Sequence, residues 1–287
     1  MIIFACDCLH DFCIVFYLSI HYMETTKKHF RSIFLSDIHL GTRGCQSDRL
    51  LDFLYTHTCD KLYLVGDIID GWKLEQSIYW PQEHTNVIRR FLSFAKQGTE
   101  VIFVTGNHDE FLRTFTPLNL GNIKMIDKAE HMTADGKNFL IVHGDEYDLV
   151  TRYSKWISIL GSWVYEVLMS LNTFINSLRN FFGLKNYWSF SAFIKYKVKS
   201  AVNFISKYEE SLVKACKNGS FDGVVCGHIH HAAIEDYEGI TYVNCGDWVE
   251  SCTAIVESND GTLSLIDYSK EELTINTKRI ETAEKAA

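Results

Sequence analysis

Acidic, amide and imidazole side chains follow five apolar runs of the sequence, directly where each run ends. The runs occupy residues 32–36, 61–65, 100–105, 138–142 and 223–226. The residues that follow them are types that bind metal ions or transfer protons: Asp37, His39, Asp67, Asn107, His108, Asp109, His143, His228 and His230. Ligand sites of α/β sheets lie beyond the carboxyl ends of the strands, so we expect these side chains to meet at one edge.

Two pairs of these residues are separated by one position: Asp37 with His39, and His228 with His230. In an extended chain such side chains point to the same side, so each pair could hold one ion. Mixed nitrogen and oxygen ligands favour Mn, Fe, Zn or Co over Ca. The ligands are too many for one ion, and they fit two ions about 3.5–4 Å apart that share a bridging carboxylate.

Composition and charge limit the class of protein. The chain has 287 residues, a formal net charge of −8 and only two prolines, which is an acidic globular composition. A nucleic-acid-binding protein would need a basic surface, so we expect no nucleic-acid partner. Nine cysteines, an odd number without a CxxC pair, indicate a reduced protein of the cytoplasm.

The chain predicts one main domain with flanking segments. Residues 1–22 are apolar but are interrupted by Asp7 and Asp11, and they lack the features of a signal peptide or a membrane span. We therefore expect residues 1–30 to be a poorly docked extension. The main domain would cover residues 31–270, followed by a charged tail at 271–287.

Short apolar runs and one amphipathic stretch indicate an α/β core. Three further runs at 240–244, 253–256 and 262–266 follow the five above, and their close succession is compatible with a sandwich. Between the second and third runs, Pro81 and Gly98 bracket a predicted helix. Its apolar stripe comprises Val87, Ile88, Phe91, Leu92 and Ala95.

Residues 147–216 form a predicted helical insertion between the 138–142 and 223–226 strands. Apolar residues recur at helical spacing over 156–178 and 194–212, and Gly219 would end the second helix. The segment carries nine Lys or Arg against four Asp or Glu, in an otherwise acidic chain. It could be a lid alone, or a lid that also contacts acyl chains or a membrane surface.

The motifs D-x-H, GD, GNHD, H and GHxH, in that order from Asp37 to His230, resemble those of the calcineurin-like metallophosphoesterases. The resemblance covers roughly residues 31–266 and implies a sandwich of two mixed β-sheets flanked by helices. It implies that the first metal is held by Asp37, His39, Asp67 and His230. It implies that the second is held by Asp67, Asn107, His143 and His228. His108 would act on the scissile phosphate as acid or charge stabiliser, oriented by Asp109.

A narrower resemblance is to the branch of UDP-2,3-diacylglucosamine diphosphatases of lipid A biosynthesis, through the segments SDIHLG, GDIIDGW and NCGDWVES. It implies cleavage of UDP-2,3-diacylglucosamine to UMP and 2,3-diacylglucosamine 1-phosphate at the cytoplasmic face of the inner membrane. Two Mn ions are the implied cofactors, with Fe, Zn, Co or Mg as alternatives. The sequence departs from the best-known members at His108, where they carry Arg.

Two other functions stay open on the sequence alone. One is a phosphodiesterase or phosphatase on a soluble nucleotide or a protein, since His108 could protonate a poorer leaving group than a diphosphate offers. The other is a non-catalytic scaffold of the same fold, although such scaffolds lose ligands and this chain keeps them all. Residues beside the ligand motifs are candidates for substrate binding: Arg43, Asp70, Trp72 and Asp247.

Overall fold

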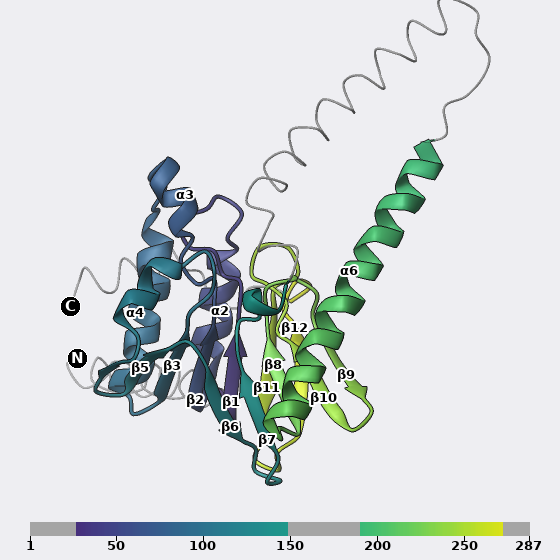
Figure 1. Ribbon diagram of the computed structural model, residues 1–287. Helices are drawn as coiled ribbons and strands as arrows, with labels where there is room; N and C mark the ends of the chain where they lie inside the picture. Colours follow the sequence, from purple (N-terminus) through teal and green to yellow (C-terminus); the bar gives the residue numbers. More distant parts are fainter. Residues whose placement is uncertain (1–26, 149–189, 272–287) are drawn as a thin grey trace, which may run out of the picture.

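The computed structural model describes residues 27–148 and 190–271, which form two mixed β-sheets packed face to face (Figure 1). The larger sheet has the strand order β12-β11-β1-β2-β3-β5-β4. Its strands are β1 (Lys28–Leu35), β2 (His57–Val65), β3 (Glu100–Val104), β4 (Leu118–Leu120), β5 (Ile123–Ile126), β11 (Thr253–Glu257) and β12 (Leu263–Asp267). Strands β1, β2, β3 and β5 pair in parallel, and antiparallel strands complete both edges.

The smaller sheet has the order β6-β7-β8-β10-β9, with β7, β8 and β10 parallel at its centre. Its strands are β6 (Ala129–Met132), β7 (Asn138–Ile141), β8 (Gly223–Cys226), β9 (Ala233–Tyr237) and β10 (Ile240–Asn244). Two mixed sheets confirm the fold predicted from the sequence.

Helices cover the outer faces of both sheets (Figure 1). Residues of α2 (Ser47–Thr56) and α4 (Gln82–Lys96) pack on the larger sheet, and α6 (Phe190–Gly219) packs on the smaller. Shorter helical segments follow strands at the site: α3 (Gly71–Gln76), η1 (Glu110–Phe115) and η2 (Asp145–Tyr147). None of the helices in the described ranges is long and apolar enough to cross a membrane.

The central strands are apolar on both faces because each face is covered. Along β1, Ile33 and Leu35 join the core beneath α2 and α4, whereas Phe34 points into the core between the sheets. On β7, Phe139 points between the sheets and Leu140 packs beneath α6. This period of two explains why the sequence has near-continuous apolar runs instead of alternating ones.

Several elements differ from their predicted bounds. Strand β1 begins at Lys28, inside the predicted extension 1–30, because its backbone pairs with β2 from the Lys28–His57 register onward. The predicted helix after Pro81 is confirmed as α4, but Leu92 is 52% exposed and Phe94 takes its place in the core. Helix α2 and strands β4, β5, β6 and β9 were not predicted. The strands are short and partly exposed, so no apolar run marks them.

The predicted second helix of the insertion is confirmed as α6, which ends at Gly219. Tyr208, Leu212 and Cys216 bury their side chains against the smaller sheet. The predicted first helix at 156–178 lies outside the described residues, as do most of the predicted extension and all but the first residue of the 271–287 tail.

Candidate metal centre

The predicted ligands gather where the parallel strands of both sheets end. Asp37 and His39 follow β1, Asp67 follows β2, and His143 follows β7. His228 and His230 follow β8. Backbone hydrogen bonds from Asp37 N to Gly66 O (3.1 Å) and from Gly227 N to His143 O (3.1 Å) hold neighbouring loops together. The parallel strands thus place the candidate ligands at one edge of the sandwich, as the sequence predicts.

Asp37, His39 and His230 form the first cluster. Asp37 Oδ1 lies 3.2 Å from His230 Nε2 and 3.8 Å from His39 Nε2. Asp37 Oδ1 and His39 Nε2 are buried and have no hydrogen-bond partner within the described residues. Buried polar atoms need a partner. A bound divalent cation would supply this partner, so the donor set fits a divalent metal.

Asp67, His143 and His228 form the second cluster. Asp67 Oδ2 lies 3.2 Å from His143 Nε2, which is also 3.2 Å from the amide oxygen of Asn107. The other nitrogen, His143 Nδ1, donates to Val65 O at 3.0 Å. A proton held at Nδ1 leaves the Nε2 lone pair for an ion, the arrangement usual for metal-binding histidine.

Asp67 lies between the two clusters. Its carboxylate lies within one group with His143 and His228 of the second cluster, and within another with His39 of the first cluster and His108. Its Oδ1 accepts the His108 backbone N–H at 2.8 Å, and the side chain is 3% exposed. Among the described acids, this position suits Asp67 to bridge two ions.

The charges of the two clusters also fit cations. Burial alone would lower the pKa of His39, but the carboxylates of Asp37 and Asp70 raise it to about 10. Burial opposes a similar rise at His143, where Asp67 raises the pKa to about 10. The buried carboxylates therefore favour positive charge at this position, and a divalent cation provides it.

Five candidate ligands have left-handed backbone conformations: Asp37 (φ 50°), His39 (φ 53°), Asp67 (φ 54°), His228 (φ 70°) and His230 (φ 53°). Such angles are uncommon outside glycine, and strained backbone concentrates at functional sites. They also correct the prediction that the i, i+2 pairs lie in extended chain, although Asp37 and His39 do share one cluster as predicted. The turn between His228 and His230 sends them to different clusters, His230 to the first and His228 to the second.

The carboxylate that lies against His108 is Asp70, whereas from the sequence we expect Asp109 to orient this imidazole. Asp70 Oδ1 lies 3.0 Å from His108 Nδ1, and Asp70 Oδ2 lies 3.2 Å from His39 Nδ1. Burial would raise the pKa of Asp70, but the two imidazoles hold it well below its usual value. Asp70 therefore stays ionised between a predicted metal ligand and the predicted acid.

Asp109 instead joins two loops. It is fully buried and accepts the backbone N–H groups of Ile68 at 2.9 Å and Gly106 at 2.5 Å. Burial raises its pKa to about 6. The side chain turns inward because these backbone donors, one after β2 and one after β3, lie on the core side of the loop.

The predicted substrate residues fall into two groups. Asp70 and Asp247 are 3% and 1% exposed. Asp247 accepts hydrogen bonds from the backbone N–H groups of Val249 and Ser251, and its Oδ2 lies 3.8 Å from His230 Nδ1. Asp70 and Asp247 therefore each contact the imidazole of a candidate site residue. Trp72 packs on His108 with ring centroids 4.1 Å apart. Arg43 is exposed, and its guanidinium lies 4.6 Å from the Tyr79 ring.

Sequence reasoning missed three residues that support the ligands. Ser36 Oγ lies 2.6 Å from both Asp37 Oδ2 and Val65 O. Tyr208 Oη donates toward the His143 and Gly227 carbonyls at 3.2 Å. Asp148 lies 3.1 Å from His228 Nε2. The only available signal was the recurrence of acids after His143, which does not distinguish Asp148 from Asp145.

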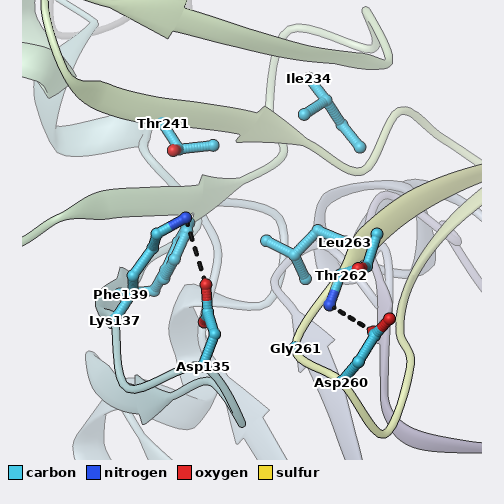
Figure 2. Close-up of a pocket in the computed structure, with 9 residues that line it drawn as sticks. All are labelled: Asp135, Lys137, Phe139, Ile234, Thr241, Asp260, Gly261, Thr262 and Leu263. Atoms are coloured by element: carbon cyan, nitrogen blue, oxygen red, sulfur yellow. Dashed lines mark hydrogen bonds and ion pairs between the residues drawn. The ribbon is translucent and has the colours of Figure 1, made fainter.

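Figure 2 shows a separate pocket of about 280 Å³ whose lining includes Phe139 of β7, Ile234 of β9 and Thr241 of β10. Phe139 and Thr241 place it near the amino-terminal ends of β7 and β10, whereas the clusters lie beyond the carboxyl ends. Its charged groups pair locally, as Lys137 Nζ lies 3.2 Å from Asp135 Oδ2. The pocket contains none of the clustered ligands.

The chain is similar to known phosphoesterases and hydrolases. A sequence model of the calcineurin-like phosphoesterase family matches residues 30–232. A UDP-2,3-diacylglucosamine hydrolase of Blochmanniella floridana is 26% identical over 82% of this chain and 97% of its own. A protein of the same name from Shewanella sp. (strain ANA-3) is 26% identical over 80% and 95%. Among solved structures, that of Yfce, a phosphoesterase from E. coli, superposes with a TM-score of 0.43 and 16% sequence identity. The superposition covers 85% of this chain and 96% of Yfce.

Proposed function

The chain belongs to the calcineurin-like phosphoesterase family, and from this we propose that it is a hydrolase that uses two divalent ions to cleave a phosphorus–oxygen bond. The observation that carries the proposal is the position of Asp67 between two clusters of buried imidazoles and carboxylates. Asp37, His39, Asp67 and His230 would hold one ion. Asp67, Asn107, His143 and His228 would hold the other, and Mn is the metal we expect.

Ions bound there would lower the pKa of a coordinated water and neutralise charge on the phosphoryl oxygens. The protein's own part is to position the substrate and supply a proton. His108 has its Nδ1 3.0 Å from Asp70 and its Nε2 4.0 Å from Asp67 Oδ2, so Nε2 faces the clusters. With 25% of its side chain exposed, His108 can reach a bound phosphate. We infer that Nε2 donates a proton to the leaving oxygen, or a hydrogen bond to a phosphoryl oxygen.

The substrate we propose is UDP-2,3-diacylglucosamine. Water would attack one phosphorus of the diphosphate, the bridging P–O bond would break, and UMP and 2,3-diacylglucosamine 1-phosphate would form. Two relatives named UDP-2,3-diacylglucosamine hydrolase, each aligned over at least 95% of its length, support this choice at 26% identity. The presence of His108 where the best-known members of that branch carry Arg keeps a second candidate open.

The insertion 147–216 supports a substrate with an apolar part. It holds 15 of the chain's 39 aromatic residues and has an excess of basic residues. Helix α6, its second half, extends well beyond the sheets (Figure 1). We propose that the insertion covers the site and contacts the acyl chains, and that its basic residues bring the protein to the cytoplasmic face of an anionic membrane.

The second candidate is a phosphodiesterase or phosphatase acting on a soluble nucleotide or a protein. It is favoured by His108, since an imidazole can protonate an alkoxide leaving group that a diphosphate substrate does not present. A scaffold without catalysis is disfavoured because all of the predicted ligands are present in the sequence.

A substrate panel with added Mn tests the proposal. The full chain would be assayed on the lipid-linked UDP-sugar, simple phosphodiesters and phosphomonoesters. We expect the highest kcat/KM on the lipid-linked diphosphate, and no turnover by protein depleted of metal. Preference for a diester or monoester would favour the second candidate. Turnover by exhaustively chelated protein would exclude the two-ion hydrolase itself.

A further inference from the structure

A carboxylate that no motif contains lies against one imidazole of the second cluster. Asp148 Oδ2 is 3.1 Å from His228 Nε2. Both side chains are buried, at 2% exposed for Asp148 and 8% for His228. A carboxylate accepts hydrogen bonds, so Nε2 of His228 carries the proton and donates it.

This contact decides which nitrogen of His228 is available to an ion. With Nε2–H directed at Asp148, only Nδ1 retains a lone pair that can face Asp67 and His143, the other members of the cluster. In the second cluster, two imidazoles each donate the proton of one ring nitrogen to an oxygen, which leaves the other nitrogen for an ion. His143 gives its Nδ1 proton to Val65 O, and His228 gives its Nε2 proton to Asp148.

The turn that carries Asp148 is held in place independently of any ion. Its backbone N–H donates to Asp145 O at 3.3 Å, and Asp145 is fixed by two contacts with Arg113 at 2.9 and 3.0 Å. On the other side, Tyr208 of α6 fills the space above Gly144, where an added Cβ would lie 1.8 Å from the hydroxyl oxygen. These contacts hold the turn that presents Asp148 to His228.

The His228 backbone by itself leaves the ring direction open. His228 has φ 70° and follows Gly227, so its side chain leaves a left-handed turn and not a regular strand. Its backbone N–H donates to Asp37 Oδ2 at 2.9 Å, which fixes the main chain but not the ring. The rings of His143 and Tyr208 lie 5.2 and 5.9 Å from the His228 ring, and Asp148 adds the hydrogen bond that fixes which nitrogen carries the proton.

We propose that Asp148 is a positioning residue that orients His228 and sets the affinity of the second ion site. The inference rests on the proposed two-ion function. Loss of such an outer partner of a metal-binding histidine lowers metal affinity by about 10–100-fold in other proteins. Asp148 acts through His228, so the first cluster should not respond.

The test is a titration of metal-depleted full-length protein with Mn, followed by calorimetry. We expect wild type to bind two ions, and we expect Asp148→Ala to lower the affinity for one of the two ions by about 10–100-fold. Asp148→Asn keeps an oxygen that can accept the Nε2 proton and should recover part of the loss. Glu146→Gln is the matched control, since this acid of the same turn pairs with Lys128 at the surface and should bind both ions normally.

A double-mutant cycle separates positioning from direct binding. If Asp148 acts through His228, Asp148→Ala should add little to the loss already caused by His228→Ala. An undiminished effect in the His228→Ala background would make Asp148 a ligand and overturn the inference. Normal binding of both ions by Asp148→Ala, or equal weakening of both ions, would overturn it too. If wild type itself binds no metal, the proposed function fails instead.

Discussion

Asp37 accepts the backbone N–H of His228 at 2.9 Å, so a carboxylate of the first cluster fixes the main chain of the second. The two residues follow β1 and β8, strands of different sheets. Gly227 permits this approach, because a Cβ there would lie 1.9 Å from Ser36 Oγ and 2.4 Å from Asp37 Oδ2. The two clusters are therefore joined through the protein as well as through Asp67.

Gly227→Ala should consequently weaken both ion sites. The added methyl must displace Ser36, Asp37 or the 227–230 loop, and such overpacking costs about 1–3 kcal/mol of unfolding free energy. Metal content and thermal unfolding measure the two effects. Gly121→Ala is the control, since that glycine also has positive φ but has nothing within 4 Å of an added Cβ. Normal metal content in Gly227→Ala would contradict the close approach.

Substitution of the bridging acid should have a larger effect than substitution of an acid in one cluster. Asp67→Asn removes charge from both clusters, so we expect turnover to be abolished and both ions to bind weakly. Asp37→Asn should mainly weaken the binding of one ion, because the amide oxygen can still accept the hydrogen bond from the His228 backbone N–H. Elemental analysis after dialysis against Mn distinguishes the two. Two tightly bound ions in Asp67→Asn would exclude its bridging role.

The candidate metal ligands could be predicted from the sequence because they directly follow apolar strands. Asp67 and His143 each stand at the end of an apolar run, and sheet topology alone brings such positions together. The partition of His228 and His230 was implied by the family resemblance but not by their spacing, since it depends on left-handed backbone angles that the residue types do not dictate. Asp148 was missed because a contact across 80 positions leaves no local pattern.

The fold was predicted to a similar extent and for a similar reason. Strands buried on both faces are apolar throughout and stand out, as in β2 and β8. Edge strands such as β9 are mostly exposed and carry polar residues, so their pairing comes from the backbone of a neighbour and not from their own sequence. Helix α2 does have an apolar stripe at Leu50, Phe53 and Leu54, which a search at helical period would have found.

His108 should contribute to catalysis without holding metal. His108→Ala should lower kcat by about 10²–10⁴ if the imidazole is a general acid, with two ions still bound. The loss should be smaller on a diphosphate than on an alkyl ester, whose leaving group needs more help. Equal losses on both substrates would mean that His108 stabilises phosphoryl charge instead.

Substitutions of Asp70 and Asp109 should have different effects, the first on turnover and the second on stability. Asp70 contacts both His108 and His39, so Asp70→Asn should lower kcat and also alter the pH dependence of turnover. Asp109→Asn should instead lower thermal stability, because it exchanges an acceptor of two buried N–H groups for an amide. A normal pH profile in Asp70→Asn would contradict its role in orienting His108.

Glu257 should make stability depend on pH in the acid range. It is fully buried and accepts hydrogen bonds from Ser32 Oγ and His131 Nε2, each at 2.8 Å. Burial would raise its pKa, but these donors lower it from 4.5 to about 2. A lowered carboxylate pKa means that the stabilisation is complete above pH 4.5 and is lost as pH falls through 2, by about 3 kcal/mol.

Denaturant unfolding of wild type and Glu257→Gln at several pH values measures this contribution. The difference in unfolding free energy should be largest above pH 5 and should shrink as the solution becomes more acidic. Glu130→Gln, at a mostly exposed position of β6, is the control and should follow wild type. A difference that is independent of pH between 2 and 6 would mean that Glu257 stabilises by packing and not by charge.

Acylation of the substrate should control its affinity. Each buried methylene contributes about 0.8 kcal/mol, so an acyl chain covered by the insertion outweighs any single polar contact. Deacylated UDP-glucosamine should therefore show a much higher KM than the acylated substrate. Trp163→Ser or Phe174→Ser, in the aromatic part of the insertion, should raise KM for the acylated substrate alone and leave metal content unchanged. If the acyl chains change kcat/KM by less than about threefold, which is under 1 kcal/mol, the insertion only covers the site and the soluble-substrate candidate is favoured.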